Sequence, residues 1–552
     1  MTNKDLANLI FPDIKHDISY YEEMYPSRDL KEGERVTRVA PSPTGYMHLG
    51  TMFQTLIDYV MVKNHGGVFY LRNEDTDTAR EIEGAVKLIM DTFHDYNIIP
   101  DEYEFEGSVV GNYGPYVQSE RKEIYHTFIK HFIEIGRAYP CFCTKEDLDG
   151  MRQKQEGRKF RTGYYGIWAH CRKLSLDEMV EKINNGEEYV IRFKSEGNFD
   201  KKFLFDDLVK GKVELPENDE DFVIMKSKDR LPTYHFAHLV DDYLMKTTHV
   251  VRGEEWLSSV PKHIELFRAL GVKGPKYIHT PLIVKKDGNG VRKLSKRKDP
   301  EASMTYYKEL GYPPITIIEA LMTIINSNYE EWHTANPDKA YDEFQYSPKK
   351  MSSSGAFFDL EKLDNISRNI ISRMKAVDVY NELLEWTKIY DEDFASILEK
   401  YKDYSIELFN IEREQKKPRK DFVNYSDIKN QVWYMYDELF DTMEKTYDFV
   451  NIDDKELIKE ACDLYFSKYY DINDDKDTWF NKMKDACEEL GYCANMKEYR
   501  EHPENYKGSI ADFSTIIRVV VTTRSMTPDL YELLKLLGKE RIQNRLATFY
   551  KL

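Results

Sequence analysis

The stretch Arg38-Val-Ala-Pro-Ser-Pro-Thr-Gly-Tyr-Met-His-Leu-Gly-Thr51 decides how the first part of this chain folds. Its first three residues suit an extended segment, and the prolines that follow exclude a helix. Beyond this stretch, apolar residues recur at the spacing of a helix: Met52, Leu56, Ile57 and Val60. The stretch therefore predicts a strand, a loop and a helix. Unpaired N–H groups and the positive end of the helix dipole then lie at the loop, which favours an anion there.

The side chains of this loop suit a nucleotide phosphate. His48 can donate a hydrogen bond to a phosphate, and Thr44 adds a hydroxyl. Gly45 and Gly50 allow a nucleotide to approach the main chain closely. The alternative is an ordinary strand-to-helix turn, which a shorter match would favour.

A second, basic stretch is Lys293-Leu-Ser-Lys-Arg297, which follows a turn-forming segment at residues 285–290 that predicts a hairpin. Five cationic residues crowd this loop: Arg292, Lys293, Lys296, Arg297 and Lys298. Such crowding is repulsive unless an anion binds, and a triphosphate in a charge-rich transition state is such an anion. The alternative is a solvated basic loop with no ligand.

Charged side chains between the two stretches could select a substrate. Leu71-Arg-Asn-Glu-Asp-Thr-Asp77 follows a β-prone segment, and open α/β sheets bind ligands at the C-terminal ends of their strands. Glu74 could there bind an ammonium group. Arg38 and Arg252 could pair bidentately with a carboxylate of the substrate.

Two structural alternatives stay open for these charges. Arg252 could pair with Glu254 or Glu255, and Asp241 and Asp242 could cap a helix. Single acid–base pairs of this kind are more often structural than catalytic.

Taken together, the stretches resemble the signatures of the class I aminoacyl-tRNA synthetases, whose HIGH and KMSKS motifs bind ATP. The patterns RxAPSPTG, RxEDTD, PTYHxAxxVDD and VxRGEEW are similar to those of the glutamyl-tRNA synthetases. Glutaminyl enzymes typically carry Glu and Asn where this chain has Ser42 and Thr44. Two positions depart from the general motifs, because Thr51 replaces the second His and Arg297 replaces the final Ser.

The resemblance implies an ATP-dependent ligase that attaches L-glutamate to tRNA(Glu) through a glutamyl-adenylate and releases AMP and diphosphate, with ATP bound as its Mg²⁺ complex. The implied catalytic residues are Thr44, His48, Lys293 and Lys296. The implied ATP-binding residues are Ser42, Thr44, His48, Gly50, Lys293, Ser295 and Lys296. The implied glutamate-binding residues are Arg38, Ala40, Ser42, Glu74, Tyr234, His238, Arg252 and Glu255.

The resemblance also implies an α/β fold, in which a Rossmann-type parallel-sheet catalytic domain is split by an acceptor-binding insertion and followed by an all-α anticodon-binding region of the bacterial type. We expect an N-terminal extension at 1–34, catalytic halves at 35–110 and 225–300, the insertion at 111–224, a stem-contact region at 301–375 and a helical anticodon-binding domain at 376–552. An apolar stripe at helical spacing in the last domain is expected in its core: Leu530, Leu533, Leu534 and Leu537. Similarity to the family implies tRNA contacts by Arg518 and Arg524.

Cysteines in the expected insertion could bind a metal. Cys141, Cys143 and Cys171, with His170 as a fourth ligand, could form a tetrahedral zinc site. Some glutamyl enzymes carry a CxC...C zinc site in this region. The usual second half of that site, a Tyr followed closely by CxH, is altered here, because the tyrosines at 164 and 165 lie farther from the last cysteine. A tyrosine ligand, and reduced cysteines without metal, are the alternatives.

Composition indicates a protein of several domains without a disulfide framework. A length of 552 residues suggests about three or four domains, and six scattered cysteines do not suit a disulfide scaffold. No signal peptide and no membrane span are evident, so we expect a cytoplasmic location. Neither a membrane nor DNA is an expected partner, and the resemblance implies a monomer.

A net charge of −18 requires any contact with an anionic tRNA to be local. Two basic patches could make such contacts: Arg152, Lys154, Arg158, Lys159 and Arg161 in one, and Lys416, Lys417, Arg419 and Lys420 in the other. Solvated, flexible loops are the alternative for both patches.

Three other classes share part of this pattern. A tRNA-modifying paralogue that glutamylates queuosine has the catalytic core but no anticodon domain. A small nucleotidyltransferase would not need Arg38, Glu74 and Arg252, and a non-catalytic tRNA-binding protein would be expected to lose His48 or the lysine loop. The long helical tail and the two motifs argue against all three. Whether tRNA(Gln) is charged as well stays open.

Overall fold

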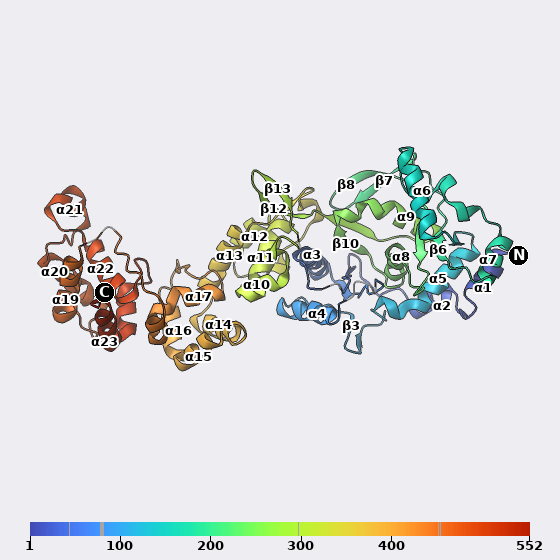
Figure 1. The fold of residues 1–552 in the computed structure, drawn as a ribbon. Coiled ribbons are helices and arrows are strands. Elements are labelled where there is room, and N and C mark those ends of the chain that lie inside the picture. The colour runs from blue at the N-terminus through green and yellow to red at the C-terminus, as the bar shows by residue number, and fades with distance from the viewer. Residues whose placement is uncertain (44, 78–81, 296, 451, 453, 552) are drawn as a thin grey trace. The chain divides into compact units, whose positions relative to one another are not determined.

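The computed structural model describes the chain except for residues 44, 78–81, 296, 451, 453 and 552. The chain forms two compact units (Figure 1). The first unit contains Met1–Tyr307 and Ile317–Asp359, and the second contains Lys308–Thr316 and Leu360–Leu552. All strands found in the described residues belong to the first unit.

Parallel strands form the centre of the first unit. β1 (Arg35–Val39) pairs in parallel with β2 (Gly67–Leu71), and β10 (His249–Gly253) pairs in parallel with β11 (Lys276–Thr280). The two pairs meet where the N–H of Thr248 donates to the carbonyl of Val36 at 3.0 Å. Residues 212 positions apart are therefore neighbours. This arrangement confirms the predicted parallel-sheet domain that is split by an insertion.

The predicted strand–loop–helix unit is present. α3 (Leu49–His65) connects β1 to β2, and His48 caps it because its Nδ1 accepts a hydrogen bond from the N–H of Gly50 at 2.9 Å. Eleven of the 17 residues of α3 are buried, so the helix lies inside the unit and not on its surface. α3 ends at Gly66, whose φ of +78° suits a residue without Cβ.

Between β2 and β10 the chain forms further strands and helices, which include the insertion predicted at 111–224. An antiparallel sheet in the order β5-β6-β9 contains β5 (Ala138–Cys141), β6 (Val190–Phe193) and β9 (Val223–Met225). Two hairpins consist of β3 (Tyr103–Phe105) with β4 (Ser108–Val110), and of β7 (Lys202–Asp207) with β8 (Gly211–Pro216). The helices are α4 (Ala85–Asp95), α5 (Lys122–Glu134), α6 (Lys145–Gly157), α7 (Leu176–Asn184) and α8 (Tyr234–Leu244). α8 returns the chain to the sheet at β10.

The N-terminal extension packs onto this insertion. α1 (Asn3–Ile10) and α2 (Ile18–Met24) bury Leu6, Ile10 and Tyr21 in the same apolar cluster as α5. Farther along, Arg28 makes two hydrogen bonds to the Glu102 carboxylate, at 2.7 and 2.8 Å. The extension is thus part of the core of the first unit.

The basic stretch follows a hairpin, as predicted. β12 (Ile283–Asp287) and β13 (Gly290–Lys293) are antiparallel, and β12 also pairs in parallel with the short β14 (Ala356–Phe357). The remaining helices before the second unit's main body are α9 (Val260–Leu270), α10 (Met304–Leu310), α11 (Pro314–Ile325) and α12 (Tyr329–Ala335).

The main body of the second unit is helical, as expected for the tail. Its helices are α13 (Leu360–Arg373), α14 (Ala376–Tyr390), α15 (Glu392–Lys400), α16 (Lys402–Asn410), α17 (Tyr425–Val432), α18 (Asp437–Thr442), α19 (Lys455–Leu464), α20 (Lys476–Glu489), α21 (Met496–Glu501), α22 (Ile510–Thr522) and α23 (Leu530–Phe549). The predicted leucine stripe of α23 is buried in the core of this unit. A backbone φ of +73° at Gly538 kinks α23. Throughout the described residues, every helix is too short or too polar to cross a bilayer.

Candidate active site

Two neighbouring cavities lie at the C-terminal ends of β1 and β10. The first has a volume of about 610 Å³ and the second about 590 Å³. Thr51, Gln54 and Trp256 line both, so the cavities share a wall. Open α/β sheets bind ligands at this edge.

The first cavity, which we call the carboxylate cavity, gathers most of the predicted glutamate-binding residues. Six of the eight line it: Arg38, Ala40, Ser42, Glu74, Tyr234 and Arg252. Glu255 instead lines the second cavity. His238 lines neither cavity; it is fully buried, where Nε2 lies 2.8 Å from the Tyr277 hydroxyl and Nδ1 lies 2.5 Å from Asp242. The structure therefore does not bring His238 to the wall of either cavity.

Arg252 is buried and has no anionic partner among the residues that the structure describes. Its side chain donates to Nε2 of His279 at 3.0 Å, and it lies 3.1 Å from Nδ1 of His263 and 3.4 Å from the Tyr234 hydroxyl. The remaining terminal nitrogen has no hydrogen-bond partner in the described part of the chain. Within the described part of the chain no carboxylate forms a salt bridge with Arg252, so the alternative pairing with Glu254 or Glu255 is wrong. A buried, uncompensated guanidinium at a cavity wall is suited to an incoming carboxylate.

Arg38 is held differently, because a network of buried charges surrounds it. Asp242 accepts from Arg38 at 3.4 Å and from Arg72 at 2.8 Å, and Arg72 also donates to Glu74 at 2.8 Å. Burial raises the pKa of Glu74, while Arg72 beside it acts in the opposite direction. Asp242, with its neighbour Asp241, lies inside α8 and pairs with arginines, so the helix-cap alternative is wrong.

The second cavity, which we call the nucleotide cavity, contains the start of α3 and the basic loop. Predicted ATP-binding residues that line it are His48, Gly50, Lys293 and Ser295. Since Nδ1 of His48 accepts from the N–H of Gly50, a neutral ring carries its proton on Nε2, which can donate. Ser42 lines the carboxylate cavity instead. Thr44 and Lys296 lie outside the described residues.

Part of the positive charge of the basic loop is neutralised, contrary to our expectation that the charges need a bound anion. Arg292 donates to both oxygens of Asp299, at 2.6 and 2.7 Å, and Lys285 pairs with Asp299 and Glu301. The Arg292 guanidinium lowers the pKa of Asp299. Asp299 also accepts from the N–H of Ser295 at 2.8 Å, so it shapes the loop. No salt bridge of Lys293 or Arg297 is found among the described residues, and both line the cavity.

Three cysteines of the insertion come together as predicted. The sulfur atoms of Cys141, Cys143 and Cys171 all lie within 4.8 Å of one another. The fourth group is Tyr164, whose hydroxyl lies 3.4 Å from the Cys141 sulfur and 3.3 Å from the Cys143 sulfur. His170 is exposed and lies outside the cluster, so the structure does not bring this predicted ligand to the three cysteines.

The donor set of this cluster fits a structural zinc ion. Hydrogen bonds within the cluster lower the pKa of the Cys141 thiol and raise the pKa of the Cys143 thiol, so the groups share one titrating network. Thiolates and a phenolate are donors that zinc accepts. Tyr164 also accepts from the N–H of Cys171 at 2.9 Å, which fixes its hydroxyl at the cluster. Three thiols and a phenol are four donors, the number that a closed zinc site uses.

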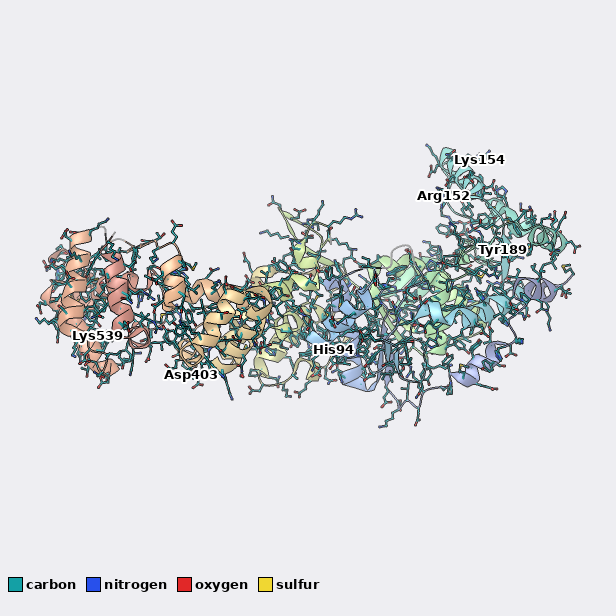
Figure 2. All side chains as sticks on the ribbon, turned by 60° about the horizontal axis from the view of Figure 1, so that its bottom comes forward. His94, Arg152, Lys154, Tyr189, Asp403 and Lys539 are labelled. Carbon is teal, nitrogen blue, oxygen red and sulfur yellow. The ribbon has the colours of Figure 1, made fainter. Side chains whose placement is uncertain are left out.

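The predicted tRNA contacts lie at the end of α22 in the second unit. Arg518 is half-buried and donates to the carbonyl of Ser525 at 3.4 Å, whereas Arg524 is exposed and donates to the carbonyl of Asn430 at 2.9 Å. Burial lowers the pKa of Arg518. In the first unit, Arg152 and Lys154 of the predicted basic patch project from the exposed side of α6 (Figure 2).

Sequence reasoning missed residues of α3 that face the cavities. Thr51, Gln54 and Asp58 recur at helical spacing and all line the carboxylate cavity. Asp58 is buried, one of its carboxylate oxygens has no hydrogen-bond partner, and burial raises its pKa well above the ordinary range. Extending the helical period from the first motif would have found this face.

The parallel sheet, the helix start at the nucleotide cavity and the basic hairpin loop define a nucleotide-binding α/β enzyme of the class I synthetase type. The family model described as tRNA synthetases class I (E and Q), catalytic domain, matches residues 34–365, and the model described as anticodon binding domain matches residues 394–550.

Similar proteins support the same classification. A glutamate–tRNA ligase of Clostridium perfringens (strain SM101 / Type A) is 46% identical, covering 100% of both chains, and one of Acetivibrio thermocellus is 45% identical, covering 99% of both. A crystal structure of a glutamate tRNA ligase from Elizabethkingia meningosepticum, in complex with its amino acid, superposes with a TM-score of 0.74 at 26% identity, covering 94% of this chain and 99% of that one. The chain belongs to the glutamate–tRNA ligase family of the class I tRNA synthetases.

Proposed function

We propose that this enzyme attaches L-glutamate to tRNA(Glu) through a glutamyl-adenylate and releases AMP and diphosphate. ATP, bound as its Mg²⁺ complex, and L-glutamate are the substrates of the first step. The 2'-hydroxyl of the terminal tRNA ribose is the acceptor of the second step, as the resemblance to class I synthetases implies.

The observation that carries this proposal is the guanidinium of Arg252 in the carboxylate cavity, which forms no salt bridge within the described residues. Every other buried arginine of the same network, namely Arg38, Arg72 and Arg121, pairs with Asp241 or Asp242. Arg252 alone among these four keeps its charge available for a ligand. We propose that Arg252 binds the side-chain carboxylate of glutamate together with Arg38. Glu74 then binds the α-ammonium group of the same substrate.

The shared wall of the two cavities supports an adenylation step. A glutamate held by its two ends presents its α-carboxylate toward Thr51 and Gln54, beyond which the nucleotide cavity begins. The α-carboxylate then attacks the α-phosphate of ATP in line. His48, through Nε2–H, and Lys293 stabilise the negative charge that develops as diphosphate leaves. Lys296 and Thr44 are assigned the same role from the sequence alone.

Zinc belongs to this proposal as a structural ion of the insertion. The ion would be held by Cys141, Cys143, Cys171 and Tyr164. It would cross-link the segments that carry these residues. No step of the reaction depends on it.

Recognition of tRNA is assigned to three predicted regions. The insertion at 111–224 would hold the acceptor end, residues 301–375 the stem, and residues 376–552 the anticodon, with Arg518 and Arg524 in contact with the tRNA. The match of residues 394–550 to an anticodon-binding model supports this assignment and argues against the queuosine-modifying alternative. We further propose that the enzyme acts in the cytoplasm, where its product is consumed, and as a monomer.

Exchange of labelled diphosphate into ATP tests the proposal. We expect exchange with glutamate when cognate tRNA is present, and no exchange with glutamine or aspartate at the same concentration. Exchange with no amino acid dependence, or transfer of glutamate to a modified base instead of the 3' end, would overturn it. Charging purified tRNA(Glu) and tRNA(Gln) side by side decides whether the second is also a substrate.

A further inference from the structure

The side-chain partners of Arg252 differ in kind from those of the other buried arginines nearby. A buried guanidinium is costly unless it is paired, and in this protein the nearby Arg38, Arg72 and Arg121 are paired with carboxylates. Arg252 is only 4% exposed, yet its hydrogen-bond partners in the described chain are two imidazoles and one phenol. Its guanidinium also lies over the aromatic ring of Tyr277, with 4.7 Å between the guanidinium carbon and the ring centroid.

The hydrogen bonds decide the protonation of both imidazoles. A guanidinium only donates, so Nε2 of His279 and Nδ1 of His263 must both accept. Each ring must then carry its single proton on the other nitrogen. Nδ1–H of His279 donates to Asp207 at 2.6 Å, and Nε2–H of His263 donates to Nδ1 of His235 at 3.0 Å. Both imidazoles facing Arg252 are therefore neutral.

The surrounding charges are consistent with neutral rings. Burial and the nearby cations Arg252 and Lys210 lower the pKa of His279, against the opposite effect of Asp207. Burial, with His238, Arg252 and His235 close by, lowers the pKa of His263 well below its ordinary range, and the effect of Asp242 is smaller.

We propose that His263 and His279 are positioning residues for amino-acid selection, because as neutral acceptors they hold Arg252 in place without cancelling its charge. The full positive charge then remains for the side-chain carboxylate of the substrate. A carboxylate at position 263 could also accept from Arg252 but would neutralise it, and a carboxylate at position 279 would do so while lying beside the Asp207 carboxylate. The inference rests on the proposed function, since it takes Arg252 as the residue that reads glutamate.

Isosteric pairs of variants separate charge from geometry. In His279→Gln the amide oxygen can replace the accepting Nε2, and in His279→Glu the same position carries a negative charge. His263→Asn and His263→Asp make the equivalent pair at the accepting Nδ1. Diphosphate exchange with cognate tRNA gives KM for glutamate, KM for ATP and the ratio of glutamate to glutamine use for each variant.

We expect the amide variants to stay near the wild-type KM for glutamate. The acidic variants should raise that KM roughly 10- to 100-fold, the range that corresponds to losing one charged hydrogen bond, with the KM for ATP unchanged. They should also shift the ratio toward glutamine, because a neutralised Arg252 no longer favours a carboxylate over an amide. A purely structural role would not distinguish the two members of a pair in this way.

His249→Gln serves as the matched control. His249 is a buried histidine on β10, the strand that also carries Arg252. Its Nδ1 lies 2.9 Å from the Thr248 hydroxyl, and His249 is not among the hydrogen-bond partners of Arg252 in the described residues. Its kinetic constants should equal those of the wild type. If His279→Glu fails to fold, as judged by thermal unfolding, the pair at His263 carries the test.

Arg252→Gln, measured in parallel, distinguishes the possible failures. If it leaves the KM for glutamate unchanged, the assignment of Arg252 is wrong and the proposed site fails with it. If it raises that KM while each acidic variant behaves like its amide counterpart, only the role of the two histidines is refuted.

Discussion

The guanidinium of Arg72 donates to Oδ1 of Asp242 across 2.8 Å, and both side chains are fully buried. Arg72 follows β2 and Asp242 lies on α8, so this contact ties together segments 170 residues apart. The same carboxylate accepts from Arg38 at 3.4 Å and contacts His238 at 2.5 Å. Asp242 thus links the two halves of the sheet and contacts Arg38, which lines the carboxylate cavity.

Asp242→Ala should destabilise the first unit strongly. The substitution removes the carboxylate that Arg38 pairs with and one of the carboxylates that Arg72 pairs with, and breaking such a buried pair costs about 3–5 kcal/mol of unfolding free energy. Urea unfolding measures this loss. Asp91→Ala is the control, because Asp91 makes only an exposed helical pair with Lys87 and its removal should change the unfolding free energy by less than about 1 kcal/mol. Equal effects of the two substitutions would contradict the role of Asp242 as a buried link.

Lys293→Ala should slow glutamate activation without affecting folding. Lys293 lines the nucleotide cavity and forms no salt bridge within the described residues. Removing one preorganised donor of this kind typically lowers the rate about 100- to 1,000-fold. Single-turnover adenylate formation measures the rate, with Lys286→Ala as the control, since Lys286 is exposed on the same hairpin and does not line the cavity. Lys296→Ala should behave like Lys293→Ala. Similar losses for Lys286→Ala would mean that the hairpin acts only through its total charge.

The purified protein should contain one zinc ion per chain, held by the cysteine cluster. Cys143→Ser should abolish the stoichiometric zinc, because a closed site needs its full set of ligands. Tyr164→Phe should weaken zinc retention against a chelator, whereas His170→Ala should retain the metal because His170 lies outside the cluster. Elemental analysis measures each. Loss of zinc from His170→Ala with retention in Tyr164→Phe would reverse the assignment.

Acidification should destabilise the first unit between about pH 6.5 and pH 3. Burial lowers the pKa of His238 to about 4 and that of His235 and His249 to about 3, from an ordinary value of 6.5. Below pH 6.5 the unfolded chain binds protons that the folded chain does not, so stability is full above that pH and falls as the pH drops. Each histidine should contribute about 1 kcal/mol per pH unit of this loss.

Thermal unfolding at a series of pH values measures this dependence. His249→Gln should flatten it, because one of the three groups is removed while the active site keeps its residues. An unchanged pH dependence in this variant would show that His249 does not contribute to the loss of stability.

Local sequence signals determined the elements that carry the chemistry. Prolines, glycines and apolar spacing near His48 fix a strand, a loop and a helix N-terminus by short-range sterics and hydrogen bonding, so these were predictable. The turn before Lys293 was predictable from the sequence for the same reason. The family signatures further grouped Arg38, Glu74 and Arg252, and the structure places all three on one cavity.

Tertiary structure alone decided which partner each of these side chains meets. Tyr164 and not His170 completes the cysteine cluster, Asp299 neutralises Arg292, and His263 and His279 surround Arg252 without a carboxylate. The physical reason is that a hydrogen bond or an ion pair acts over a few ångströms, and the folded chain sets those distances. No periodicity in the sequence encodes them. The sequence by itself therefore determined where the reacting groups sit on their elements, while the packing of the sheet, α8 and α9 decided which charges are cancelled and which remain for the substrate.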